Sequence, residues 1–185
     1  MHQIVLHFWF VESSPSQRWK ADPKFDALIA ERFGTLHENA IRAELYDWRR
    51  DALGRLAEMI VLDQFSRNLH RSHPRAFAAD PMALALAQEA VALKADLELS
   101  AEERVFLYVP FMHSESALIH QNAEHLFRTN AIESNCDFEL KHKVKLKLKL
   151  LAALSPLASA MRYHRLASPH WLAAMVYRLS PARTV

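Results

Sequence analysis

The sequence predicts an all-α domain of about six to eight helices, packed as antiparallel helical hairpins. Three observations favour this fold class. Helix-capping signals recur along the chain, β-like content is confined to residues 4–10 with no partner strand, and only 2 of the 185 residues are glycine. So few glycines exclude glycine-rich nucleotide-binding loops and glycine-turned β-barrels. A composition of 51% apolar and 24% charged residues excludes a disordered chain.

The first half of the chain contains three predicted helices. Asp22 followed by Pro23 is typical of an N-cap with proline in the first turn, and Gly34 stands where a left-handed C-cap would end that helix. A short helix is expected over residues 36–46. A longer one is expected over residues 51–70, because apolar residues recur there on one helical face.

The second half begins with another capped helix. Asp80-Pro81 repeats the first capping signal and opens a stretch of mostly alanine and leucine that reaches about residue 93. Its small side chains predict close packing against neighbouring helices. Ser100 and Glu103 have the spacing of a capping box and predict the next helix start.

The last predicted helix carries a candidate catalytic residue. We expect Pro110 to break the preceding helix, so that His113 lies at the start of a helix over residues 114–130. The positive end of that helix dipole would disfavour an imidazolium. Ser114 and Glu115 are explained by capping, whereas His113 is not, and it becomes the candidate general base with Glu115 beside it.

Charge divides the chain near residue 140. Residues 1–139 carry a net charge of −7, whereas residues 140–185 hold 9 basic and no acidic side chains. We interpret the first range as the helical domain and the second as a basic C-terminal segment, either helical or partly disordered.

Cysteine usage and hydropathy predict a cytoplasmic location. Cys136 is the only cysteine, which excludes a disulfide scaffold and suits a reducing compartment. The apolar N-terminus has no basic leader, and no run of about 18 apolar residues occurs, so neither a signal peptide nor a membrane span is expected. No metal or cofactor is expected either, because the histidines and acids lack a His-Glu-x-x-His pattern and no cysteine set is present.

A dense polar cluster lies within the predicted helix at residues 51–70. Asp63 and Arg67 are four residues apart, Arg71 continues the same face, and Gln64 and Asn68 add amide groups. One interpretation is a structural ion pair that closes the end of a buried helix. The other is a pocket for an anion or carboxylate, which the arginines bind and Asn68 orients.

Two motifs resemble those of a known bacterial family. Residues 62–68 read Leu-Asp-Gln-Phe-Ser-Arg-Asn and residues 110–115 read Pro-Phe-Met-His-Ser-Glu. With Phe8-Trp9-Phe10 before them, they resemble domain-of-unknown-function family 924 over residues 4–130, about two thirds of the chain. The resemblance implies a superhelical fold similar to that of tetratricopeptide (TPR) proteins and implies no established reaction.

The resemblance also implies one site. The family's characteristic polar positions fall on residues of two helices, which would converge on one pocket: Asp63, Gln64, Arg67, Asn68, Arg71, His113, Glu115 and Gln121. Two departures occur, since the family usually has glycine where this sequence has Val11 and Ser72.

A larger departure lies at the C-terminus. The family ordinarily continues with a histidine-containing helix, a segment rich in phenylalanine, arginine and histidine, and a Ser/Thr-x-Glu-Glu helix. After His142 this pattern is absent, and acidic residues disappear in the same place. Our hypothesis is a reading-frame shift, or an equivalent divergence, around residues 138–150.

Two functions from different classes remain open. The leading one is a binding or scaffold module, which takes a peptide terminus or a small anionic ligand in its polar pocket. The alternative is a hydrolase- or transferase-like enzyme, with His113 as general base and Arg67 and Arg71 binding an anionic substrate. Nucleic acid is not expected as a partner of the basic segment, because its residues form no groove-reading motif.

Overall fold

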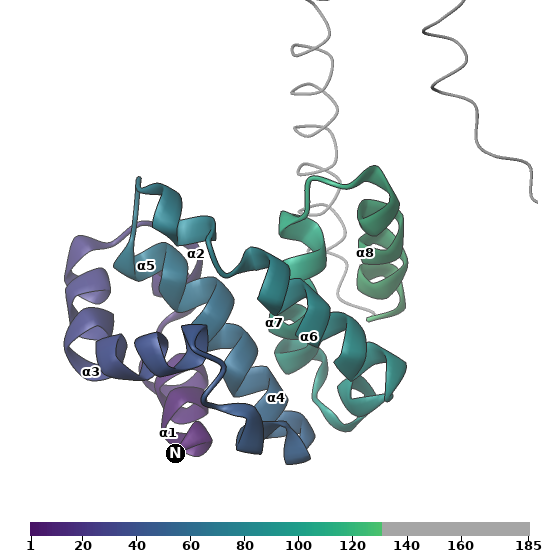
Figure 1. The fold of residues 1–185 in the computed structure, drawn as a ribbon, viewed down its shortest axis with the longest axis horizontal. Coiled ribbons are helices and arrows are strands. Elements are labelled where there is room, and N and C mark those ends of the chain that lie inside the picture. Colours follow the sequence, from purple (N-terminus) through teal and green to yellow (C-terminus); the bar gives the residue numbers. More distant parts are fainter. Residues whose placement is uncertain (131–185) are drawn as a thin grey trace, which may run out of the picture. The chain divides into compact units, whose positions relative to one another are not determined.

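The described part of the chain is entirely helical. The computed structural model describes residues 1–130, and in that range eight α-helices alternate with shorter π- and 3-10-helical elements (Figure 1). The α-helices are α1 His2–His7, α2 Pro15–Trp19, α3 Pro23–Ile41, α4 Ala52–Met59, α5 Ser66–Leu69, α6 Asp80–Ala92, α7 Ala101–His113 and α8 Ala117–Thr129. The shorter elements are η1 Phe8–Glu12, η2 Tyr46–Arg50, η3 Ile60–Phe65, η4 Pro74–Phe77 and η5 Ala95–Glu98. The predicted all-α class and number of helices are confirmed.

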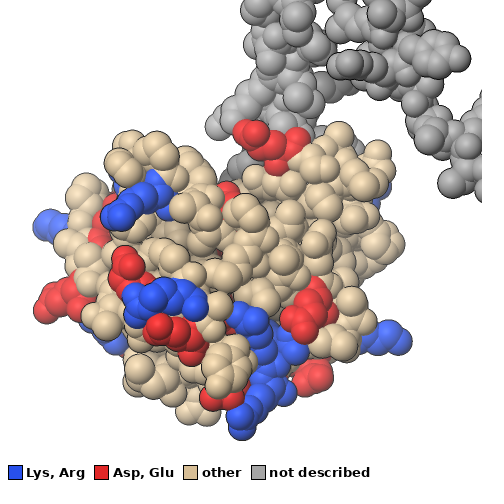
Figure 2. Space-filling model, in the orientation of Figure 1, with Lys and Arg blue, Asp and Glu red and all other residues tan. Residues whose placement is uncertain are grey.

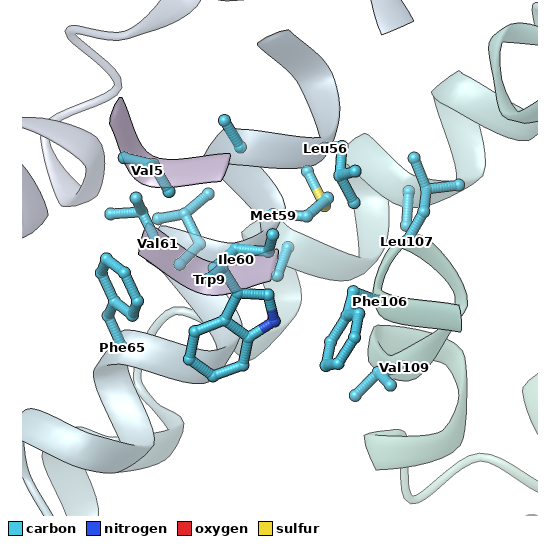
Figure 3. Close-up of a cluster of buried hydrophobic side chains, with 14 of the residues drawn as sticks. Val5, Trp9, Leu56, Met59, Ile60, Val61, Phe65, Phe106, Leu107 and Val109 are labelled. Carbon is cyan, nitrogen blue, oxygen red and sulfur yellow. The ribbon is translucent and has the colours of Figure 1, made fainter. Parts of the chain in front are cut away.

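The β-like residues 4–10 are helical, in α1 and η1. Val5, Phe8 and Trp9 recur at helical spacing, and each is at most 1% exposed. Figure 3 shows Trp9 facing Phe106 of α7, with the indole nitrogen on that side, and the two rings meet edge to face with centroids 5.5 Å apart. This helical pattern of burial outweighs the weak strand preference of the segment.

Helix α3 is longer than predicted. Asp22 caps it as expected, accepting hydrogen bonds from two backbone N–H groups of the first turn. Gly34, however, lies in the helix interior without a positive φ, so the predicted C-cap is wrong. The separate helix expected over residues 36–46 is largely the end of α3. Because Leu36 and Ala40 continue the buried face, packing holds the helix through the glycine.

The predicted helix over residues 51–70 forms α4, η3 and α5 in direct succession. Leu56 of α4 and Ile60 of η3 are fully buried in the cluster of apolar side chains in Figure 3. The π-helical η3 was not predicted, although such insertions are frequent at functional sites. It carries Asp63 and Gln64, and every residue of η3 is buried.

Helices α6, α7 and α8 follow one another with short connections and pack as consecutive neighbours. The expected close packing of α6 is seen in Ala83, Ala87 and Ala90, which are all 0% exposed. The capping box of Ser100 and Glu103 is present in full at the start of α7. Local capping signals therefore predicted this helix start correctly.

Pro110 does not end α7, contrary to the prediction. It lies inside the helix, which continues to His113, and α8 begins only after its N-cap residue, Ser116. A proline this close to the C-terminus removes a single backbone hydrogen bond. Burial of Phe111 and Met112 holds the last turn in place. His113 is therefore the last residue of a helix and not the first.

Several predictions concern residues beyond 130 and so lie outside the described residues. These are Cys136, the divergence around residues 138–150 and the basic segment 140–185. Within residues 1–130, no helix is both long enough and apolar enough to cross a membrane.

Candidate functional site

Asp63 is the centre of a buried polar network. Its side chain is 1% exposed and lies on η3, between α4 and α5. Oδ2 accepts a hydrogen bond of 2.5 Å from Nε2 of Gln64. Oδ1 lies 2.9 Å from Nη1 of Arg67 and 2.8 Å from Nδ1 of His113, so Asp63 joins η3 and α5 to the end of α7.

These partners keep Asp63 ionised. Burial is the largest single influence and acts to raise the pKa of its carboxyl, but the charge and hydrogen bond of His113, the charge of Arg67 and the hydrogen bond from Gln64 together outweigh it. The resulting pKa lies below the ordinary value. The predicted pairing of Asp63 with Arg67 at i and i+4 is present.

Arg67 also binds a second carboxylate. Its two terminal nitrogens lie 3.0 Å from the two oxygens of Asp80 in a bidentate pair, and its guanidinium lies over the ring of Phe77. Asp80 was expected to cap α6, but the N-cap position is Ala79 and Asp80 makes no cap hydrogen bond. Burial raises the pKa of Asp80 despite the opposing effect of Arg67.

The other arginine of the cluster is held by Asp26 of α3. Arg71 binds both oxygens of Asp26 at 2.6 and 2.7 Å, and Nδ2 of Asn68 donates a hydrogen bond of 2.8 Å to the same carboxylate. Burial acts to raise the pKa of Asp26, but these hydrogen bonds reverse it and the pKa is lowered. These three side chains connect α3 to α5 and to the turn that follows α5.

His113 reaches the network from the C-terminal end of α7. The prediction that the positive end of a helix dipole acts on its ring is therefore wrong, because the carboxyl end of α7 is the negative one. The ring lies beside a carboxylate, since Nδ1 bonds to Asp63. With Nδ1 occupied, any proton exchange with a ligand has to use Nε2.

A pocket of about 190 Å³ lies beside this network. One side is lined by five residues that the sequence singled out: Gln64, Arg67, Asn68, Arg71 and His113. The other side is lined by residues 17–21, from the end of α2 and the turn that follows it. Sequence reasoning missed this segment as part of the site. Its only visible signal was Trp19 between two basic residues, a weak pattern by itself.

Three predicted site residues do not line the pocket, and one of them, Asp63, is the buried centre of the network beside it. Glu115 and Gln121 are exposed, Glu115 just beyond the end of α7 and Gln121 on α8. Among residues 1–130, no group of three histidine, cysteine or acidic side chains is arranged to hold a metal ion. The pocket lining instead consists of basic, amide and aromatic side chains with one alanine.

The fold and the site define an all-α protein with an ion-paired polar pocket between its helices. The sequence model of the family described as "Bacterial protein of unknown function (DUF924)" matches residues 5–154, and the chain belongs to that family. The match includes both motifs and extends into the basic segment.

A solved structure shares this fold. It is the structure of a protein of unknown function from Agrobacterium tumefaciens, 32% identical, with a TM-score of 0.74 over 79% of this chain and 82% of that one. No curated protein matches the chain.

The backbone accounts for one of the two departures from the family pattern. Ser72 has a φ of 64°, in the left-handed region that glycine enters without steric cost. A glycine is therefore the residue that this turn favours. Val11 has no positive φ, so the backbone gives no reason for a glycine at that position.

Proposed function

We propose that this protein is a binding module whose pocket takes a small anionic ligand or a peptide terminus. The observation that supports it is the charge of the lining. Every charged side chain that lines the pocket is basic, namely Arg18, Lys20, Arg67 and Arg71, and the carboxylates that balance three of them are not part of the lining. An anion entering this pocket meets N–H donors and no acidic side chain.

The arginines have a different role from the one first expected. Arg67 and Arg71 already bind Asp80 and Asp26 in bidentate pairs. These contacts hold the lining rigidly and occupy guanidinium N–H groups that a ligand would otherwise bind. Lys20 has no ion-pair partner within the described part of the chain and is exposed at the rim. We therefore expect its ammonium group to supply most of the charge that attracts the ligand.

The site would recognise its ligand locally. Figure 2 shows basic and acidic side chains interspersed over the face in view, without a broad patch of one sign. A mixed surface of this kind gives little long-range attraction for a polyanion. This supports a small ligand at the pocket.

The test is a titration of acetate and of inorganic phosphate into the full chain at low ionic strength, followed by calorimetry. We expect Lys20→Ala to weaken binding about tenfold, the loss of one charge-assisted contact. Lys24→Ala removes the same charge from an exposed position on α3 outside the pocket and serves as the control. Equal affinities in both variants, or no binding by the wild type, would contradict the proposal.

A second candidate function rests on the pairing of Asp63 with His113. A buried carboxylate bonded to Nδ1 of a histidine that lines a pocket is the arrangement that orients a general base in hydrolases. In that case Arg67 and Arg71 would frame an anionic substrate, with His113 as the base. Hydrolysis of anionic ester and phosphoester substrates should then be lost in His113→Asn. Turnover that does not depend on His113 would remove this candidate.

A further inference from the structure

We infer that the ligand of this pocket carries an N–H group next to its carboxylate, as an N-acyl amino acid or the C-terminal residue of a peptide does. The inference rests on the proposed function and narrows its ligand class. It follows from hydrogen-bonding groups of the lining that the internal network leaves unused.

The first of these groups is the amide oxygen of Gln64. The residue is 8% exposed and lines the pocket. Its Nε2 donates to Asp63, and because a carboxylate only accepts, the orientation of the amide is fixed with Oε1 on the other side. Oε1 accepts no hydrogen bond from residues 1–130. Because Oε1 itself keeps access to solvent, water can satisfy it in the free protein, and a ligand in the pocket can replace that water with an N–H donor.

The amide of Asn68 repeats this arrangement one turn later. Nδ2 donates to Asp26, which fixes its orientation in the same way, and Oδ1 likewise accepts no hydrogen bond from a described residue. Gln64 and Asn68 are four residues apart on successive helical turns, so their side chains lie on one face. One wall of the pocket therefore offers two acceptors.

The lining also offers a cation. Lys20 lies on the 17–21 segment, which lines the same pocket as the amides of η3 and α5. A ligand made only of acceptor oxygens, such as acetate or phosphate, satisfies Lys20 and leaves both amide oxygens without a donor. A ligand with a carboxylate and an adjacent N–H can bond both to Lys20 and to one of the two amide oxygens.

N-acetylglycine is a small molecule that carries a carboxylate and one adjacent neutral N–H, and it serves as the probe.

The experiment compares three ligands of nearly equal shape on the full chain by calorimetry. N-acetylglycine has both the carboxylate and the N–H, O-acetylglycolate replaces the N–H by an ester oxygen, and N-acetylglycinamide has no charge. We expect N-acetylglycine to bind about tenfold more tightly than either analogue, as the loss of one hydrogen bond to a buried acceptor predicts.

The outcomes separate this inference from the proposed function. If O-acetylglycolate binds as tightly as N-acetylglycine, the N–H is not recognised and the inference fails, while the anion pocket stands. If none of the three ligands and neither acetate nor phosphate binds, both fail. If N-acetylglycinamide binds as tightly as N-acetylglycine, the carboxylate is not recognised and the inference also fails.

A tetrapeptide ending in glycine distinguishes the two sources of this chemistry. If N-acetylglycine binds and the tetrapeptide binds with comparable affinity, the natural ligand is a peptide C-terminus. If N-acetylglycine binds and the tetrapeptide does not, the natural ligand is a free N-acyl amino acid. Lys20→Ala, with Lys24→Ala as control, should weaken N-acetylglycine and leave N-acetylglycinamide unchanged. The opposite pattern would overturn the assignment of the carboxylate to Lys20.

Discussion

Asp63 is the residue on which the polar network depends. Its buried carboxylate accepts hydrogen bonds from Gln64 and His113 and forms an ion pair with Arg67, and removal of its charge leaves the arginine and the histidine beside a neutral amide. We expect Asp63→Asn to lower the free energy of unfolding by about 3 kcal/mol, the usual cost of breaking a buried ion pair from one side. Urea denaturation followed by circular dichroism measures it.

The control is an ion pair with no burial. Asp47 and Arg50 of η2 pair on the surface, with 58% and 79% of their side chains exposed. Asp47→Asn should change the free energy of unfolding by less than about 1 kcal/mol. Equal effects of the two substitutions would show that Asp63 contributes nothing beyond an ordinary surface contact.

The same carboxylates predict how stability depends on pH. The pKa values of Asp63 and Asp26 are lowered in the folded protein, so the folded state binds these protons less readily than the unfolded chain does. Their contribution is complete above the unfolded pKa of about 3.9 and is lost as pH falls through the lower folded values. Denaturation at pH 7 and pH 3 should show this loss, and it should be smaller in Asp63→Asn.

At this scale the sequence predicted only contacts within one helix. The pairing of Asp63 with Arg67 follows from a spacing of four residues. Asp26, which is 45 residues from Arg71, could not be identified as its partner, because tertiary packing alone brings α3 to α5. Residues 17–21 were missed for the same reason.

Helix starts were predicted better than helix ends. Asp22 and the Ser100 capping box act through atoms within a few residues, so their effect is visible in the local sequence. Gly34 and Pro110 were interpreted as breaks because local preference disfavours them in helices. Burial of neighbouring side chains overrode that preference, and no single-sequence pattern reports such burial.

The two glycines give a direct test of these elements. Gly34 lies inside α3 with no atom near the position of an added Cβ, so Gly34→Ala should raise the free energy of unfolding by about 0.5–1 kcal/mol. At Gly54 an added Cβ would overlap the carbonyl oxygen of Trp48, so Gly54→Ala should lower it by about 1–3 kcal/mol. Thermal melts of both variants should shift in opposite directions. A loss of stability in Gly34→Ala would contradict the placement of that residue in an unstrained helix.

For the whole molecule, the family match and the acid-free basic segment overlap over residues 140–154. The family match ends at residue 154, inside the acid-free segment 140–185. We propose that residues 1–139 form the helical domain and that the remaining segment is a product of a reading-frame shift or an equivalent divergence. The resemblance predicted the family and the all-α fold. It could not predict a ligand, because it implies no established reaction.

Sequencing of the coding DNA tests that origin. We expect an alternative frame, beginning around codons 138–150, to encode the Ser/Thr-x-Glu-Glu segment that the family ordinarily carries. If no frame restores it, the segment is a true divergence in the protein and the frame-shift hypothesis is wrong.

Residues from η3, α5, α7 and the 17–21 segment line one pocket, which we propose binds an anion. Amide chemical-shift mapping during a titration with N-acetylglycine tests it most directly. We predict that the shifts cluster on residues 17–21, Gln64, Asn68 and His113, and that about tenfold more ligand is needed to produce them in Lys20→Ala but not in Lys24→Ala. Shifts that are absent, scattered over the surface, or unchanged in Lys20→Ala would contradict it.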